Sequence, residues 1–191
     1  MNKQTLIKTP LYGVSVIEPM VFSDPRGFFI ETYNRRDFSE IGIGSEFVQD
    51  NHAMSSKGIL RGLHYQYPEP QQKLMRVIRG EVFDVVVDIR EKSPQFGKWF
   101  GILLSEENKK MLHVSEGFAH GYLALSDHVE FMYKVSAYYR PEYEGGIRWD
   151  DPGIGINWPL EKYGVINPVL SEKDQKLPTL TDFRTPFKSG N

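Results

Sequence analysis

The sequence predicts an all-β protein in which two sheets form a barrel, with only a few short helices. Three observations carry this prediction. The 17 Gly and 12 Pro are spread along all 191 residues, so turns are frequent. The runs between them are short and rich in Val, Ile, Phe and Tyr, which is typical of sandwiches and barrels. Stretches with helical periodicity and caps are few.

The clearest predicted strand covers residues 82–89, because its apolar residues alternate with a period of two. One face is entirely apolar and holds Phe83, Val85, Val87 and Ile89. The opposite face mixes valines with acids and holds Val82, Asp84, Val86 and Asp88.

Other segments of similar composition are predicted strands, and in chain order they are 12–18, 27–33, 46–52, 59–66, 73–79, 98–104, 110–114, 119–125, 129–137 and 146–149. A short helix is expected over 37–41, where Gly42 would stop it. Ser171 is a candidate N-cap for a second helix near the C-terminus. No repeat or linker interrupts the chain, so we expect one domain over residues 1–183 and a frayed tail over 184–191.

Composition excludes several classes of function. The net charge is −2 and the pI about 6.2, so no basic surplus favours nucleic acid or anionic membranes. No apolar run approaches the ~20 residues of a membrane span, and the N-terminus has no signal-peptide core. The chain has no Cys, which rules out disulfides and thiolate metal sites and fits a cytoplasmic protein.

The most informative segment is KGILRGLHYQ, residues 57–66. Arg61 offers a fixed fork of donors for phosphate oxygens, and His64 suits proton transfer near neutral pH. Together they suggest a pocket that holds an anionic substrate and moves a proton. In a regular strand the two side chains would point to opposite faces, because their separation is odd. Both reach one pocket only if the strand bulges, and Gly62 is the expected place for the bulge.

Further segments agree in order and spacing, namely DPRG at 24–27, QKL at 72–74, GFAHG at 117–121, FMYK at 131–134 and LSEKD at 170–174. Together with KGILRGLHYQ they resemble the dTDP-4-dehydrorhamnose 3,5-epimerase family, from about residue 11 to residue 182. The resemblance implies a cupin-like jelly roll, a double-stranded β-helix. It also implies inversion of C3 and C5 in dTDP-4-dehydro-6-deoxy-glucose, within dTDP-L-rhamnose biosynthesis. No redox cofactor is expected, which agrees with the lack of Rossmann and P-loop glycine patterns.

The resemblance also assigns residues. It makes His64 the general base, Asp174 its partner, Tyr133 the general acid and Lys73 the stabiliser of the enolate. His120 would help to stabilise that charge and orient the sugar. The remaining contacts to the nucleotide sugar are Arg26, Phe29, Glu31, Gln49, Asn51, Arg61, Tyr139, Glu144 and Lys173. The strand holding Arg26, Phe29 and Glu31 is expected to reach the pocket of a neighbouring subunit, so the partner would be a second copy in a homodimer.

Taken without the resemblance, several of these residues have plainer interpretations. Asp174 fits an acid near the start of a helix, stabilised by the helix dipole. Tyr133 fits a strand aromatic that fills a barrel, and Lys73 a surface lysine whose stem covers apolar neighbours. Glu144 fits a solvated turn. Only the family pattern favours their catalytic or binding roles over these alternatives.

A metal site is not expected, although small barrels of the cupin kind often hold one. Their usual ligands are three His and a Glu. Here His64 and His120 occupy ligand positions, but Gln66 stands where another His is expected, and Lys73 lies where an acid would. Two imidazoles beside an ammonium make a poor site for Zn, Mn or Fe.

Two kinds of alternative stay open. The first is a single epimerase or a ketoisomerase acting on a related nucleotide sugar, and Tyr133 favours epimerisation over isomerisation. The second is a sugar-binding barrel without catalysis, or a metal-dependent cupin oxygenase. The joint presence of His64, Lys73, Tyr133 and Asp174 argues against simple binding, and the depleted ligand set argues against the oxygenase. The nucleotide base and the order of the two inversions are left undetermined.

Overall fold

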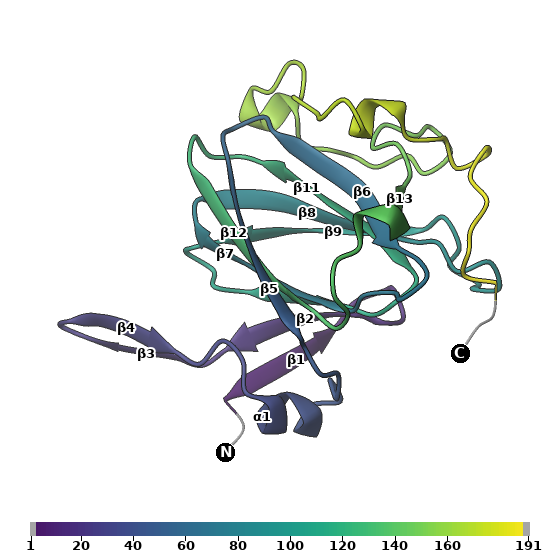
Figure 1. Ribbon diagram of the computed structural model, residues 1–191. Helices are drawn as coiled ribbons and strands as arrows, with labels where there is room; N and C mark the ends of the chain where they lie inside the picture. Colours follow the sequence, from purple (N-terminus) through teal and green to yellow (C-terminus); the bar gives the residue numbers. More distant parts are fainter. Residues whose placement is uncertain (1–2, 189–191) are drawn as a thin grey trace.

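The computed structural model describes residues 3–188 and is nearly all β, as the sequence predicts (Figure 1). Its strands are β1 (Gln4–Lys8), β2 (Val14–Pro19), β3 (Val21–Asp24), β4 (Gly27–Ile30), β5 (Gln49–Ser55), β6 (Leu60–Gln66), β7 (Lys73–Arg79), β8 (Glu81–Asp88), β9 (Trp99–Ser105), β10 (Met111–Val114), β11 (Phe118–Ala124), β12 (Val129–Val135) and β13 (Glu144–Gly146). The α-helix is α1 (Arg35–Glu40), and single 3₁₀ turns cover Pro141–Tyr143, Glu161–Tyr163 and Asp174–Lys176. No helix in this described range is long and apolar enough to span a membrane.

Two antiparallel sheets face each other and form the barrel. One sheet has the order β1-β2-β10-β7-β12-β5, and the other has the order β13-β6-β11-β8-β9. The strands β3 and β4 pair only with each other and stand out from the barrel as a hairpin (Figure 1). This is the expected jelly-roll arrangement, in which most neighbouring strands are distant in the sequence.

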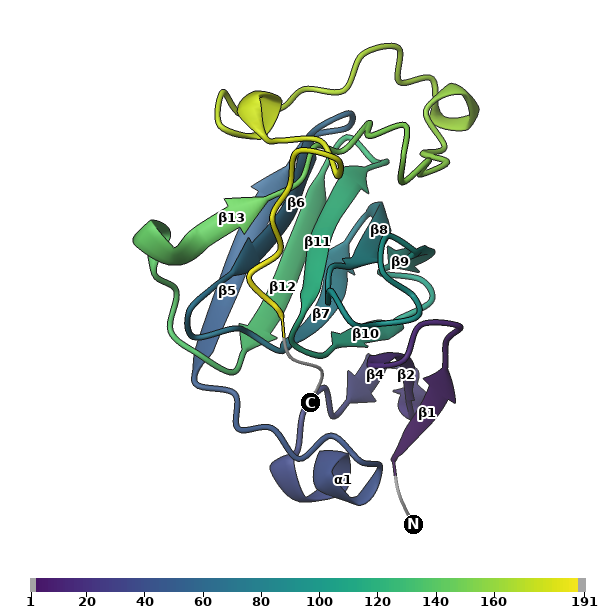
Figure 2. The same ribbon diagram turned by 90° about the vertical axis from the view of Figure 1, so that its right-hand side faces the viewer.

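Buried apolar side chains pack both inside the barrel, between the two sheets, and on its outer surface, beneath other segments of the chain. Val82 and Val86 of β8 pack between the sheets, against residues such as Leu112 and Phe131. The alternate residues of β8 face outward and pack with Trp158, which lies in the segment after β13. Figure 2 shows that segment passing over the top of the two sheets. The predicted alternation of β8 is therefore confirmed, but both of its faces are buried. Asp84 and Asp88 are accordingly fully buried as well.

The helix α1 forms where the sequence predicts it, and its Phe38 packs against the outer face of the six-stranded sheet, on residues of β2, β7 and β10. The Asn34 side chain accepts hydrogen bonds from the backbone N–H groups of Arg36 and Asp37, so it caps the first turn. Phe38 is fully buried, and such burial contributes about 1.5–3 kcal/mol. Gly42 follows the helix with φ of +92°, a conformation that favours glycine and ends the helix.

The structure differs from the sequence prediction in several strands and in the second helix. Residues 27–33 are not one strand. The strand β4 ends at Ile30 and pairs with the preceding strand β3 in an exposed hairpin. The second helix is only the 3₁₀ turn Asp174–Lys176, although Ser171 does accept a hydrogen bond from the Asp174 N–H. Strands β1 and β3 were not expected, and the strand predicted over 146–149 is instead β13, which pairs with β6 only over Glu144–Gly146.

The end of the chain is also more ordered than the expected tail over 184–191. Thr185 is buried and donates its hydroxyl to the Ile89 carbonyl. Phe187 packs edge-on against Tyr65 and Tyr67, with ring centroids 5.8 and 5.3 Å away. The packed chain therefore extends through Phe187, beyond the expected boundary at residue 183, because these apolar side chains cover the outside of β6. Residues 189–191 lie outside the described range.

Candidate active site

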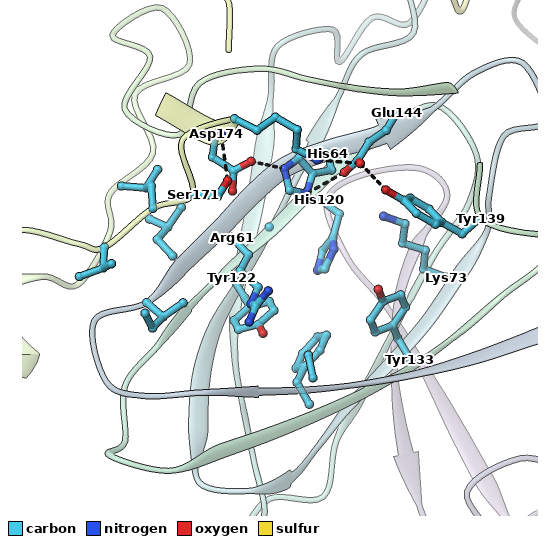
Figure 3. Close-up of a pocket in the computed structure, with 18 residues that line it drawn as sticks. Arg61, His64, Lys73, His120, Tyr122, Tyr133, Tyr139, Glu144, Ser171 and Asp174 are labelled. Carbon is cyan, nitrogen blue, oxygen red and sulfur yellow. Dashed lines mark hydrogen bonds and ion pairs between the residues drawn. The ribbon is translucent and has the colours of Figure 1, made fainter. Parts of the chain in front are cut away.

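A cavity of about 630 Å³ lies between the two sheets and is lined by side chains from both of them (Figure 3). All four catalytic residues expected from the sequence, and five of the ten expected binding residues, line it. The cavity-lining members of that set are Arg61, His64, Lys73, His120, Tyr133, Tyr139, Glu144, Lys173 and Asp174. They come from both sheets and from the segment that crosses the cavity mouth.

A bulge in β6 brings Arg61 and His64 into the same cavity, as the sequence predicts. His64 pairs with His120 of β11 and Arg61 pairs with Tyr122, so two residues of β6 oppose one residue of β11. Gly62 sits in the bulge with φ of +119°. A Cβ at Gly62 would meet the Cα of Gly121 at 2.6 Å, so the two backbones approach closely only because both residues are glycines.

His64 is held by a buried carboxylate. Its Nε2 lies 2.6 Å from Oδ1 of Asp174, whose side chain is 3% exposed. The second oxygen of Asp174 accepts the Gly62 backbone N–H at 3.3 Å. Burial alone disfavours the Asp174 carboxylate. Its bond to His64, the nearby His64 charge, and the donors on Gly62 and Ser171 outweigh burial, so the pKa lies below its usual value. An ionised acid in this position fixes the ring and stabilises an imidazolium.

Glu144 lies on the side of His64 away from Asp174, and it contacts Tyr139, Lys173 and His64 itself. It accepts the Tyr139 hydroxyl at 2.7 Å and pairs with the Lys173 ammonium at 2.7 Å. Its Oε1 is 3.5 Å from the His64 Nδ1. Burial raises the Glu144 pKa, but Lys173, Tyr139 and His64 together bring it below the usual value. The hydrogen bond to Glu144 is the main reason that the Tyr139 pKa rises to about 12.

Lys73 and His120 lie deeper in the cavity. Burial lowers the pKa of Lys73 to about 8, while the negative charges of Glu144 and Asp84 oppose that change. The Nε2 of His120 lies 3.0 and 3.1 Å from the two oxygens of Asp84. Burial also lowers the pKa of His120, despite the neighbouring Asp84. The cavity floor therefore holds a lysine that is still largely protonated at neutral pH beside a neutral imidazole.

Tyr133 faces the cavity from the opposite sheet to His64. It lies on β12, whereas His64 lies on β6, and Figure 3 shows the cavity between the two side chains. Burial raises the Tyr133 pKa, with smaller contributions from Tyr122 and Glu144, so the phenol keeps its proton. A planar group bound between His64 and Tyr133 would thus meet a proton acceptor on one face and a proton donor on the other.

Arg61 lies at the cavity wall and is oriented by two hydrogen bonds. Its Nε donates to the Ser55 hydroxyl at 3.2 Å and its Nη2 to the Met54 carbonyl at 3.2 Å. The Ser55 oxygen also lies 3.0 Å from the Tyr122 hydroxyl. These contacts leave donors of the guanidinium for an anion at the cavity mouth.

The remaining predicted binding residues do not line this cavity. Gln49 and Asn51 lie on β5 and are linked to each other at 2.8 Å, and the Gln49 oxygen accepts the Tyr139 backbone N–H, so they border the site. Arg26 and Phe29 belong to the exposed β3–β4 hairpin, which has a small pocket of its own. Glu31 follows the hairpin and pairs with Lys3 at 3.2 Å. Within residues 3–188 this hairpin group does not line the main cavity.

Gln66 stands where a metal-binding cupin would have a further His, and its side chain bonds to backbone groups instead. The amide of Gln66 donates to the carbonyls of Glu69 and Tyr138 and accepts the Arg140 N–H. It holds the loop after β12 against β6. Among the described residues, no group of three or more His, Asp or Glu side chains is arranged to hold a metal ion.

Sequence reasoning missed two groups at the site. Asp84 was placed on the mixed face of β8, but that face lines the barrel interior, where the acid meets His120. Tyr122 lines the cavity and stacks on Phe131 with centroids 4.4 Å apart. The signal for Asp84 was an acid between valines in a strand with apolar residues on both faces. Tyr122, one of ten tyrosines, gave no comparable signal.

Comparisons with known proteins agree on one family. The family model described as dTDP-4-dehydrorhamnose 3,5-epimerase matches residues 8–182. A relative of that name from Methanothermobacter thermautotrophicus is 53% identical over 95% of this chain and 97% of its own length. Among solved structures, dTDP-6-deoxy-D-glucose-3,5-epimerase from Legionella pneumophila, in complex with dTDP-4-keto-L-rhamnose, superposes with a TM-score of 0.90 at 44% identity, covering 95% of both chains. A 3'-monoepimerase from Streptomyces bikiniensis in complex with dTDP-quinovose gives a TM-score of 0.83 at 35% identity, covering 91% of this chain and 88% of the other.

Proposed function

This chain belongs to the dTDP-4-dehydrorhamnose 3,5-epimerase family, and we propose that it inverts C3 and C5 of dTDP-4-dehydro-6-deoxy-glucose to give dTDP-4-dehydro-rhamnose. It is an isomerase that acts on a nucleotide sugar. One observation carries the proposal. His64, paired with Asp174, and Tyr133 face the same cavity from opposite sheets, and Lys73 lines that cavity as well.

The first step is removal of a proton next to the C4 ketone, which acidifies the hydrogens on both flanking carbons. His64 takes this proton through Nδ1, since its Nε2 is bound to Asp174. Asp174 stabilises the imidazolium that forms. The electron pair moves onto the ketone oxygen, and the Lys73 ammonium stabilises the resulting enolate.

The second step returns a proton from the other face. Tyr133 donates its phenolic proton to the carbon, which inverts that centre. The raised pKa of Tyr133, due first to burial, keeps the phenol protonated until the carbanion is formed. Proton exchange with solvent resets both groups, and the same pair then acts on the second carbon. Neither step consumes a redox equivalent, so no nicotinamide is required.

The rest of the molecule binds the nucleotide diphosphate. Arg61 and Lys173, at the cavity mouth, supply positive charge for the diphosphate. His120, Gln49, Asn51, Tyr139 and Glu144 contact the sugar or the base. Arg26, Phe29 and Glu31 act on the pocket of a second copy in a homodimer. The support for this is that Phe29 is 66% exposed and that the Arg26 side chain, 90% exposed, pairs with Asp24 beside it.

The experiment is incubation with dTDP-4-dehydro-6-deoxy-glucose in deuterated water, followed by NMR of the sugar. We expect deuterium at both C3 and C5 and inverted product, in chelated buffer without added metal or nicotinamide. Deuterium and inversion at one carbon only would instead identify a monoepimerase, the activity named for the more distant Streptomyces bikiniensis relative. Activity that disappears on exhaustive chelation and returns with a stoichiometric metal would refute the metal-free mechanism.

A further inference from the structure

Asp84 is a fully buried carboxylate in the wall of the barrel. It lies on the interior face of β8, between Val82 and Val86, both of which pack in the core. In the ladder between β8 and β11 it pairs with Tyr122, and Val86 pairs with His120. Asp84 and His120 are therefore diagonal neighbours on the same face, which lets the carboxylate reach the ring.

The His120 ring is fixed by contacts of two kinds. Both oxygens of Asp84 lie within 3.1 Å of its Nε2, so this nitrogen carries the proton and donates it. The ring also stacks nearly parallel to Phe131, with an interplanar angle of 16° and centroids 6.3 Å apart. Among residues 3–188, Asp84 is the one hydrogen-bond partner recorded for this ring, and the ring lines the cavity.

This arrangement is costly for stability alone. A buried carboxylate is unfavourable unless it is paired, and a buried ion pair or polar pair often gives no more stability than apolar residues of the same size. The neighbouring positions on the same face are filled by valines. An acid at position 84 is better explained by the state that it imposes on His120.

We infer that Asp84 is a positioning residue, which holds His120 as the Nε2-protonated tautomer so that Nδ1 presents a lone pair to the sugar. His120 then accepts a hydrogen bond from a sugar hydroxyl and orients the ring between His64 and Tyr133. It does not donate to the enolate, and that role belongs to Lys73 alone. This assignment rests on the proposed function for its substrate, but the tautomer itself does not depend on it.

The electrostatic surroundings agree with a neutral acceptor. Burial lowers the pKa of His120, and the positive charges of Lys73 and His64 lower it further, whereas Asp84 opposes the change. The ring is therefore neutral at neutral pH, and with its one proton on Nε2 it has none at Nδ1 to donate. In effect, Asp84 determines which end of a neutral imidazole faces the substrate.

The direct test is NMR of the protein labelled with ¹⁵N-histidine, at neutral pH. We expect His120 to show a protonated Nε2 and a bare Nδ1 in the wild-type chain. Asp84→Asn can donate its own N–H to Nε2, so the tautomer should reverse or become mixed. We expect kcat to fall by roughly 10- to 100-fold, less than the ~10⁴-fold effect of neutralising the acid that orients a catalytic base, because His120 is not the base. TDP affinity should stay within about twofold, since the diphosphate groups are elsewhere.

Asp88→Asn is the matched control, because Asp88 is equally buried on the same strand but binds Arg90 and Ser93 outside the cavity. It should lower thermal stability while leaving the His120 spectrum and kcat close to wild type. A wild-type His120 protonated at Nδ1 would overturn the inference even if Asp84→Asn does not fold. A folded Asp84→Asn with unchanged tautomer and kcat, or an equal loss in Asp88→Asn, would overturn it as well. If the wild type does not epimerise the sugar, the proposed function fails, and the wild-type spectrum still decides the tautomer.

Discussion

The cavity and the β3–β4 hairpin contain residues from the same predicted site, but the chain holds them in very different ways. In the cavity, strand register and buried contacts fix each group, as His64 shows with Asp174 at 2.6 Å. On the hairpin, all four residues of β3 are exposed and Arg26 pairs with Asp24 two residues away. The groups proposed to move protons are therefore all held within one chain, whereas the proposed substrate contacts on the hairpin would need a surface beyond it.

Replacement of His64, the proposed base, should impair the chemistry of the cavity most. In His64→Asn we expect solvent exchange at both sugar carbons to fall by roughly 10²–10⁴-fold, the usual cost of losing a general base. TDP binding should survive, because the diphosphate is held by other groups. The measurement is deuterium incorporation by NMR, together with calorimetric TDP binding. His128→Asn, an exposed histidine paired with Glu130, is the control and should behave as wild type. Exchange at the wild-type rate in His64→Asn would reject this base.

Tyr133→Phe should separate proton removal, proposed for His64, from proton return on the opposite face, proposed for Tyr133. The His64 side stays intact, so a proton can still leave and return on the same face. Deuterium should then enter recovered substrate while inverted product falls sharply, and both are measured in one NMR time course. Tyr163→Phe removes a hydroxyl that bonds Glu81 outside the cavity and is the control. Equal loss of exchange and inversion in Tyr133→Phe would count against a role as the acid.

The proposed role of the hairpin in the pocket of a neighbouring subunit is tested by mixing two variants, each of which should be inactive alone. Arg26→Ala and His64→Ala chains should exchange subunits, and each mixed dimer then has one pocket with both groups intact. Part of the activity should return, while neither variant alone recovers it. Sedimentation measures the oligomeric state, and labelled subunits verify the exchange. A monomer at working concentration, or no recovery between subunits that do exchange, would contradict a shared pocket.

The smallest expected effect concerns pH. Burial lowers the Lys73 pKa to about 8, although Glu144 and Asp84 partly oppose this. Below that pH Lys73 is an ammonium that stabilises the enolate, and above it the charge is lost, so kcat should decline on the alkaline side of about pH 8. The measurement is a pH profile of kcat. Lys73→Arg keeps a positive charge throughout, so its residual activity should lack this decline, and a decline at the same pH would reassign it to another group.

Regular strands could be predicted from the sequence because burial of one strand face places apolar residues at every second position. Segment 73–79 was predicted with the bounds of β7, since its ends are set by polar turns. The hairpin was misjudged because an exposed strand carries no burial pattern, so β3 gave no signal. Asp84 was missed for a different reason, since β8 is buried on both faces and its alternation does not show which face lines the cavity.

The site was predictable where a local motif forces its geometry. The odd spacing of Arg61 and His64 called for a bulge at Gly62, and the structure has one. The pairing of His64 with Asp174 joins residues 110 positions apart, and only the family pattern suggested it. Long-range pairing of this kind depends on the fold as a whole, which spacing along the chain does not encode.

Asp174 is carried by the segment across the cavity mouth rather than by a barrel strand. That segment is tied to the barrel by backbone hydrogen bonds of Val169 with Gly58 and Leu60, and by the Gly62 N–H to Asp174 itself. Segments with few such bonds open locally at a lower free energy than the core. On gradual heating, catalysis should therefore be lost before the sheets unfold, and it should return on cooling from that interval. The working temperature limit of the enzyme is then set by a short surface segment and not by the barrel.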